Sequence, residues 1–168
     1  MKSGLTIRED NYNVVLDALK QLSGADVLVG IPAGPPRDDA PLSNAELGYL
    51  QSTGATVEID GETVTLPPRP FLDMGIEDSR DKTTERLKLA AQSALEGKAG
   101  VASMHLEAAG QIARDASKAV IEAGDRLTPL SEKTIKKRRE MKPPIPGDKP
   151  LRARGFLFRA IQYVVRKK

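Results

Sequence analysis

Two long stretches of helix-forming residues in the middle of the chain constrain its fold more than any other feature. One runs from Ile76 to about Leu95 and the other from Val101 to Ala123, with Gly97–Gly100 between them. The second stretch is rich in alanine, which has the highest intrinsic helix propensity and allows close approach between helices. We therefore predict two long helices that pack through small side chains.

A β-hairpin is predicted at residues 56–66. Asp60-Gly61 is a strong signal for a two-residue turn between antiparallel strands. With this turn Val57 faces Val64, and alternate side chains share a face. The apolar residues expected on that face are Val57, Ile59, Val64 and Leu66.

The remaining elements are short. Residues 11–22 have apolar side chains at three- and four-residue spacing, which predicts an amphipathic helix. Residues 26–31 read as a buried strand, and Ser43-Asn-Ala-Glu46 has the spacing of a capping box for a helix that ends at Gly54. We predict an α+β fold: a small, mostly antiparallel sheet of strand 26–31, the hairpin and a C-terminal strand at 160–165, packed on one face by the two longer helices, with a basic C-terminal helix and strand.

Prolines mark the irregular segments. Residues 32–41 form a Pro-rich loop, residues 66–72 an extended segment with three prolines, and residues 142–150 a break and hinge. Because proline reduces the entropy lost on ordering, the first two segments suit docking onto neighbouring proteins.

Charge divides the chain into two parts. Residues 125–168 hold 14 Lys/Arg and 4 Asp/Glu, whereas residues 1–124 hold 12 Lys/Arg and 19 Asp/Glu. We therefore predict an acidic α+β body over 1–124 and a basic segment over 125–168 that completes the sheet or acts as an arm. Such asymmetry indicates contact with a polyanion, or with neighbouring copies that meet acidic face to basic face.

Catalytic chemistry is poorly supported. The absence of cysteine excludes disulfides, thiolate metal sites and cysteine nucleophiles, and His105 is the only histidine. No stretch has the roughly 20 apolar residues that span a bilayer, and the first twenty residues show no apolar signal-peptide region. We expect no enzyme activity, no cofactor, no metal site and no membrane contact.

The densest basic run, Lys136-Lys-Arg-Arg139, lies on a predicted helix, where its side chains do not share one face. A solvated helix is the ordinary interpretation. Neighbouring cations favour an interaction with DNA or an adjacent subunit, and any contact with nucleic acid would be to the phosphate backbone. The residues expected to interact are Lys136, Lys137, Arg138, Arg139, Arg152, Arg154, Arg69, Pro70 and Phe71.

Four short motifs occur in the order and spacing of one family. They are Val27-Leu-Val-Gly-Ile-Pro32, Asn44-Ala-Glu-Leu-Gly-Tyr-Leu-Gln-Ser-Thr-Gly54, Pro67-Pro-Arg-Pro-Phe-Leu72, and Pro129-Leu-Ser-Glu-Lys-Thr-Ile135 followed by Lys149-Pro-Leu151 and a closing strand. Over residues 25–166 the chain resembles the neck and tail-completion proteins of long-tailed bacteriophages, the minor tail protein Z type. It departs from the family's acidic turn at Arg152-Ala-Arg-Gly-Phe-Leu157, which makes that segment more basic.

The resemblance implies a structural protein of the virion, assembled in the host cytoplasm and located at the head–tail junction. Its expected partners are further copies of itself in a hexameric or dodecameric ring, the head connector or stopper protein, and the tail terminator or tail tube protein. The ring would line the DNA path and could contact the genome through its backbone. Two alternatives stay open: a tail terminator that caps the tube, and a small cytoplasmic protein that binds nucleic acid non-specifically.

Overall fold

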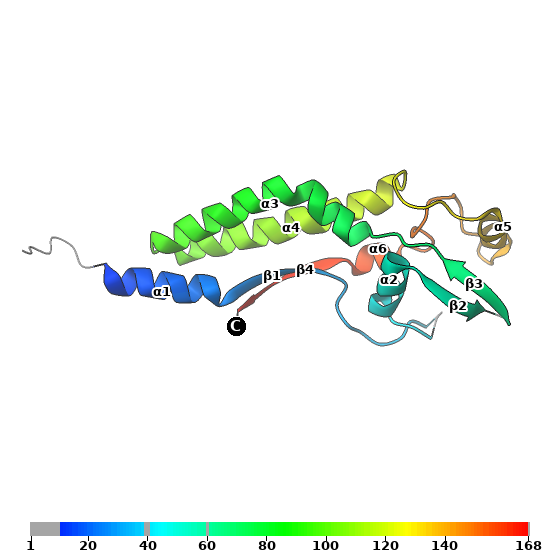
Figure 1. Ribbon diagram of the computed structural model, residues 1–168, viewed down its shortest axis with the longest axis horizontal. Coiled ribbons are helices and arrows are strands. Elements are labelled where there is room, and N and C mark those ends of the chain that lie inside the picture. Colours follow the sequence, from blue (N-terminus) through cyan, green and yellow to red (C-terminus); the bar gives the residue numbers. More distant parts are fainter. Residues whose placement is uncertain (1–10, 39–40, 60, 168) are drawn as a thin grey trace, which may run out of the picture.

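Two antiparallel helices, α3 and α4, form the long axis of the protein in the computed structural model (Figure 1), which describes residues 11–38, 41–59 and 61–167. Over these residues the fold is α+β, with two small antiparallel sheets beside six helices. The elements are α1 (Tyr12–Ser23), β1 (Ala25–Gly30), α2 (Asn44–Thr53), β2 (Ala55–Ile59), β3 (Glu62–Leu66), α3 (Phe71–Leu95), α4 (Ala99–Ala123), α5 (Glu132–Glu140), α6 (Phe156–Ala160) and β4 (Gln162–Lys167).

Helices α3 and α4 approach closely because the residues between them are small. A Cβ atom built on Gly75 of α3 would lie 2.3 Å from Cα of Ser117 on α4, so the two backbones nearly touch there. Ser117 is completely buried, and its hydroxyl donates to the carbonyl of Ala113 at 2.9 Å, which satisfies it inside its own helix. The prediction of two long helices packed through small side chains is confirmed.

Strands β1 and β4 form a two-stranded sheet along α4 (Figure 1). Tyr163 of β4 packs against α4 at Gly110, where an added Cβ would lie 2.4 Å from the tyrosine ring. Since neighbouring residues of a strand face opposite ways, the pair Leu28 and Val164 lies on the outer face, with 47% and 51% of each residue exposed. One face of this sheet is therefore covered by α4 and the other is open.

The main hydrophobic cluster lies where α3 begins and α4 ends. It also contains residues from the basic C-terminal segment, which belongs to the fold and does not extend from it as an arm. Its buried members are Phe71, Val120, Ile121, Leu127, Leu157 and Ile161.

Our prediction of a single sheet is wrong, because the hairpin β2–β3 and the pair β1–β4 are separate two-stranded sheets. The hairpin itself has the predicted register, with Val57 opposite Val64 and Ile59 opposite Glu62. Helix α2 follows the long segment after β1 and places the hairpin at the far end of the molecule (Figure 1). Strand β3 ends at Leu66 because the next two residues, Pro67 and Pro68, have no N–H to donate.

Three predicted boundaries also move. Helix α3 starts at Phe71, inside the segment expected to be extended, because Pro70 is its N-cap and proline is tolerated at a helix start. Helix α4 starts at Ala99, so Gly100 lies within the helix, and the C-terminal strand is 162–167. The capping box at Ser43 and Glu46 is present as predicted.

Replacement of Gly75 by alanine tests the contact between the long helices. The new methyl group would overlap backbone atoms of Ser117, which cannot rotate away, so we expect Gly75→Ala to lower the free energy of unfolding by about 3 kcal/mol. Urea denaturation measures this change.

Gly100→Ala is the matched control, since nothing lies within 4 Å of a Cβ at this helical position. We expect it to stabilise the protein by about 0.5–1 kcal/mol through helix propensity. Equal changes in the free energy of unfolding for Gly75→Ala and Gly100→Ala would contradict the close contact between α3 and α4.

Candidate functional site

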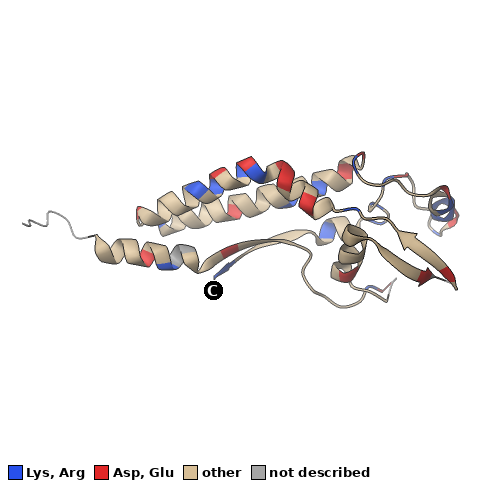
Figure 2. Cartoon of the chain, viewed as in Figure 1, with Lys and Arg blue, Asp and Glu red and all other residues tan. Residues whose placement is uncertain are grey.

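The basic end of the molecule is built around α5. Ser131 caps this helix by accepting a hydrogen bond from the amide of Thr134 at 3.2 Å. Lys136, Lys137 and Arg139 are exposed, and Figure 2 shows the positive charge gathered on this helix. Within the described part of the chain no ion pair reaches any of these three side chains, so they remain available to an external anion.

Arg138 differs from its neighbours because it points back into the protein. Its guanidinium donates to the carbonyl of Lys149 at 3.0 Å, and its own carbonyl accepts from the amide of Ile145 at 2.9 Å. Burial lowers the pKa of Arg138. Residues 142–150, expected to be a hinge, are thus attached to α5, and Ile145 is buried.

Arg152 and Arg154 are exposed but take part in internal contacts. Arg152 donates to the Glu122 carboxylate at the end of α4, at 3.0 Å, and lies over the ring of Phe158. The carbonyl of Arg154 accepts from Arg159 at 3.1 Å. Part of the basic charge predicted for interaction is therefore used to attach the C-terminal segment to α4.

Arg69 is buried, with 5% of the residue exposed, so it does not belong to the open basic surface on which we expected it. Its guanidinium donates to the carbonyls of Thr128 and Pro129 and to Oε1 of Gln51, at 2.7, 3.1 and 3.0 Å. Burial lowers its pKa, and the charge of Arg138 lowers it further. Arg69 thus holds three segments of this chain together.

Pro70 and Phe71 follow Arg69 into the start of α3. Pro70 is partly buried, and its carbonyl accepts from the amide of Met74 in the first turn. Phe71 has no exposed surface and lies in the hydrophobic cluster. An aromatic residue in this position cannot reach a neighbouring protein, so the expected role of Phe71 in docking is also corrected.

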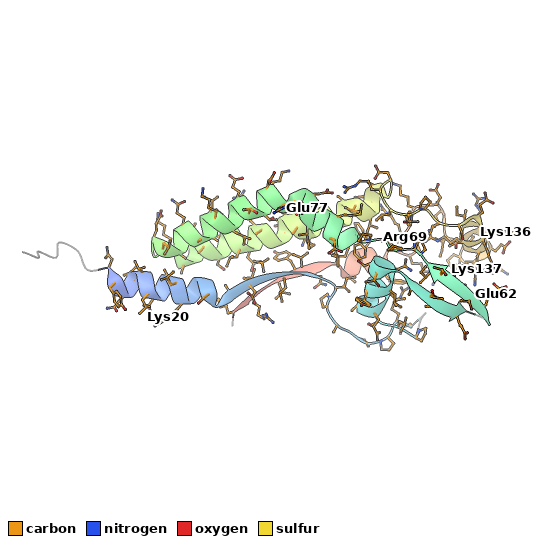
Figure 3. All side chains as sticks on the ribbon, viewed as in Figure 1. Lys20, Glu62, Arg69, Glu77, Lys136 and Lys137 are labelled. Carbon is orange, nitrogen blue, oxygen red and sulfur yellow. The ribbon has the colours of Figure 1, made fainter. Side chains whose placement is uncertain are left out.

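A cleft runs between β3 and α5. It consists of two adjoining cavities of about 460 and 440 Å³, both lined by Val64 of β3 and by Arg138 of α5. At the outer end Lys133 bridges to Glu62 at 2.6 Å, which raises the pKa of Lys133 and lowers that of Glu62. Figure 3 places Glu62, Lys136 and Lys137 at this end of the molecule, with Arg69 nearer the long helices.

The sequence reasoning identified two arginines of this cleft, Arg69 and Arg138, but missed the cleft itself. The signal for Val64 was present, since it is one of the apolar residues of the predicted hairpin face. That this face would border α5 depends on tertiary packing, and no local pattern indicates it.

A second surface lies on α1. Ala18 is buried, whereas Tyr12, Val15 and Leu19 are exposed, with 52% of Leu19 open to solvent. The apolar arc of this helix is therefore wider than the surface that the other described residues cover. The predicted amphipathic helix is confirmed, but the described residues, α3 among them, cover its apolar side only in part.

The described residues contain no group of three or more His, Asp or Glu side chains arranged to hold a metal ion. His105 is half-buried on α4. No helix in the described ranges is long and apolar enough to cross a membrane. The prominent features are thus a basic helix, an arginine-lined cleft and an open apolar surface.

Comparisons with models of protein families, with curated proteins and with solved structures found no match to this chain.

Arg69→Ala tests the internal role of this side chain. It leaves the carbonyls of Thr128 and Pro129 without their donor, so we expect the free energy of unfolding to fall by about 2 kcal/mol or more. Arg69→Lys keeps the charge but lacks the planar set of N–H donors of arginine. Its free energy of unfolding should lie between those of the unaltered protein and of Arg69→Ala. Chemical denaturation gives the values.

The control is Arg139→Ala, which removes the same charge from an exposed position and should change stability by less than about 0.5 kcal/mol. If Arg69→Ala were equally mild, the hydrogen bonds around Arg69 would not hold the segments together.

Proposed function

We propose that this chain is a structural subunit of a phage head–tail junction, a neck or tail-completion ring that joins the connector to the tail tube. The observation that carries the proposal is the open apolar surface of α1, with Val15 and Leu19 exposed. A monomer seldom leaves such a stripe uncovered, whereas a subunit buries it against the next copy. The ordered motifs of residues 25–166 supply the phage context.

The open face of the β1–β4 sheet supports the same interpretation. Leu28 and Val164 are paired across the strands and half exposed on the side away from α4. Within the described part of the chain, neither edge of this two-stranded sheet pairs with a further strand. A neighbouring subunit can cover such a face and edge together, which suits an assembly better than an isolated chain.

Charge supports a head-to-tail arrangement. Exposed carboxylates lie in the first turns of α3, where Glu77, Asp78 and Asp81 border a shallow hollow, while α5 carries exposed cations. Glu77 pairs with Arg80 and Asp78 with Arg126, so Asp81 contributes most of the charge available to a neighbour. Unlike patches at different places on one chain can meet when copies repeat by rotation, which closes a ring. Cations left facing the lumen would contact DNA phosphates.

The proposal predicts that purified phage particles contain this protein at a fixed copy number. Ring symmetry leads us to expect about 6 or 12 copies per particle, measured by quantitative mass spectrometry. Its absence from particles would contradict a structural role. Imaging of labelled particles would separate a neck ring from a tail terminator, because these alternatives differ in position and not in fold.

Leu19→Lys tests the surface on which the proposal depends. A charge at this half-exposed position should leave the monomer folded but prevent incorporation into particles. Gln111→Lys, at an exposed position on α4 away from the acidic hollow of α3, adds the same charge and should incorporate normally.

A non-specific nucleic-acid-binding protein is the second candidate, favoured by exposed Lys136, Lys137, Arg139 and Lys142, for which the described residues provide no ion pair. If all four contact phosphates, the affinity of the free monomer for DNA should fall with salt with a log–log slope of about −3 to −4. Each Lys→Gln or Arg→Gln substitution should reduce the slope by about one. Salt-independent or undetectable binding would contradict this candidate.

A further inference from the structure

We propose that the cleft between β3 and α5 binds an extended segment of a partner protein in which an acidic side chain lies beside apolar ones. Three features of the cleft carry this inference: a free strand edge, two arginines without a carboxylate partner, and an apolar lining. The proposal holds whether or not the chain is a ring subunit, since it rests on the cleft alone.

The edge of β3 faces the cleft. Residues 64–67 line it consecutively, although neighbouring side chains of a strand point to opposite faces, so the cleft follows the strand edge. In a two-residue hairpin the pair flanking the turn, Ile59 and Glu62, is hydrogen-bonded, and such pairs alternate along the ladder. The amide of Thr65 therefore points away from β2, where it can pair with an added strand.

Arg69 and Arg138 supply positive charge that no carboxylate of the described residues neutralises. A guanidinium has five N–H donors, of which Arg69 uses three and Arg138 one, all toward neutral oxygen atoms. A carboxylate in the cleft could accept the remaining donors in the planar geometry that arginine favours. Burial and then the nearby charge of Arg138 lower the pKa of Arg69, and a carboxylate between the two arginines would offset the second effect.

The lining favours a peptide over a nucleic acid. Leu47, Leu66 and Leu157 contribute apolar surface, which phosphate groups do not require and which aliphatic side chains can cover. A duplex presents its phosphates on a broad convex surface, whereas this cleft is a concave pocket beside a strand. Among the described residues, Glu62 is the only acidic one that lines it, and Lys133 already neutralises Glu62.

A selection from a random heptapeptide library against the full-length protein provides the test. We expect enrichment of Asp or Glu next to aliphatic residues. A selected peptide, labelled with fluorescein, then gives an affinity by fluorescence polarisation. The same peptide with Glu→Gln or Asp→Asn should bind about tenfold more weakly. A selection without acidic enrichment would overturn the proposal.

Variants of the protein locate the site. Arg138→Gln should weaken peptide binding about tenfold, whereas Arg139→Gln removes an equal charge from the same helix, outside the cleft, and should leave it unchanged. Thr65→Pro removes the outward amide and keeps the hairpin ladder, because proline is tolerated at a free edge. It should also weaken binding.

Arg138 also holds the carbonyl of Lys149, so a second variant guards against misfolding of Arg138→Gln. Ala153→Glu places a carboxylate at an exposed position bordering both cavities, and alanine has no side-chain hydrogen bond or ion pair to lose. The new carboxylate should pair with the arginines of the cleft and so weaken binding of the selected peptide. Equal losses with Arg138→Gln and Arg139→Gln, or displacement of the peptide by duplex DNA at equal phosphate and carboxylate concentration, would overturn the proposal.

Discussion

The close contact of α3 and α4 at Gly75 and Ser117 determines how the rest of the protein is arranged. With the backbones this near, the two helices form one unit, and α4 is free to carry the β1–β4 sheet on another side. On that side the ring of Tyr163 packs directly against Gly110, because glycine has no Cβ to keep it away. Small residues at these two places set the distances between layers, because a Cβ at either would displace its neighbour.

Arg69 has the corresponding role at the end of the helical pair. Its three hydrogen bonds connect the end of α2, the entry to α3 and the turn at Thr128 and Pro129, which leads directly into α5. The orientation of α5, and with it the position of every cation on that helix, therefore depends on a buried cation held by carbonyl dipoles. If a carboxylate of this chain paired with Arg69, it would neutralise the positive charge of Arg69. Less positive charge would then act on an external ligand.

Local signals in the sequence were sufficient for part of this structure. The sequence Asp60-Gly61 predicted the hairpin register that β2 and β3 have, although Asp60 itself lies outside the described residues. Ser43 with Glu46 identified the start of α2, because each signal acts through residues close in sequence. The separation of the sheets, the burial of Arg69 and the uncovered side of α1 depend on which distant segments meet. The motif Pro67–Leu72 illustrates the difference: its prolines predicted an extended chain, whereas Pro70 caps a helix and Phe71 enters the core.

The basic segment combines two kinds of positive charge. Lys136, Lys137 and Arg139 project into solvent, where salt screens them and any polyanion can approach. Arg138, on the same helix, lies beside a cleft with apolar walls, where an ion is screened less and an anion must fit a shape as well as a charge. One turn of α5 thus separates a surface suited to non-specific contact with phosphates from a site suited to recognition of a particular peptide.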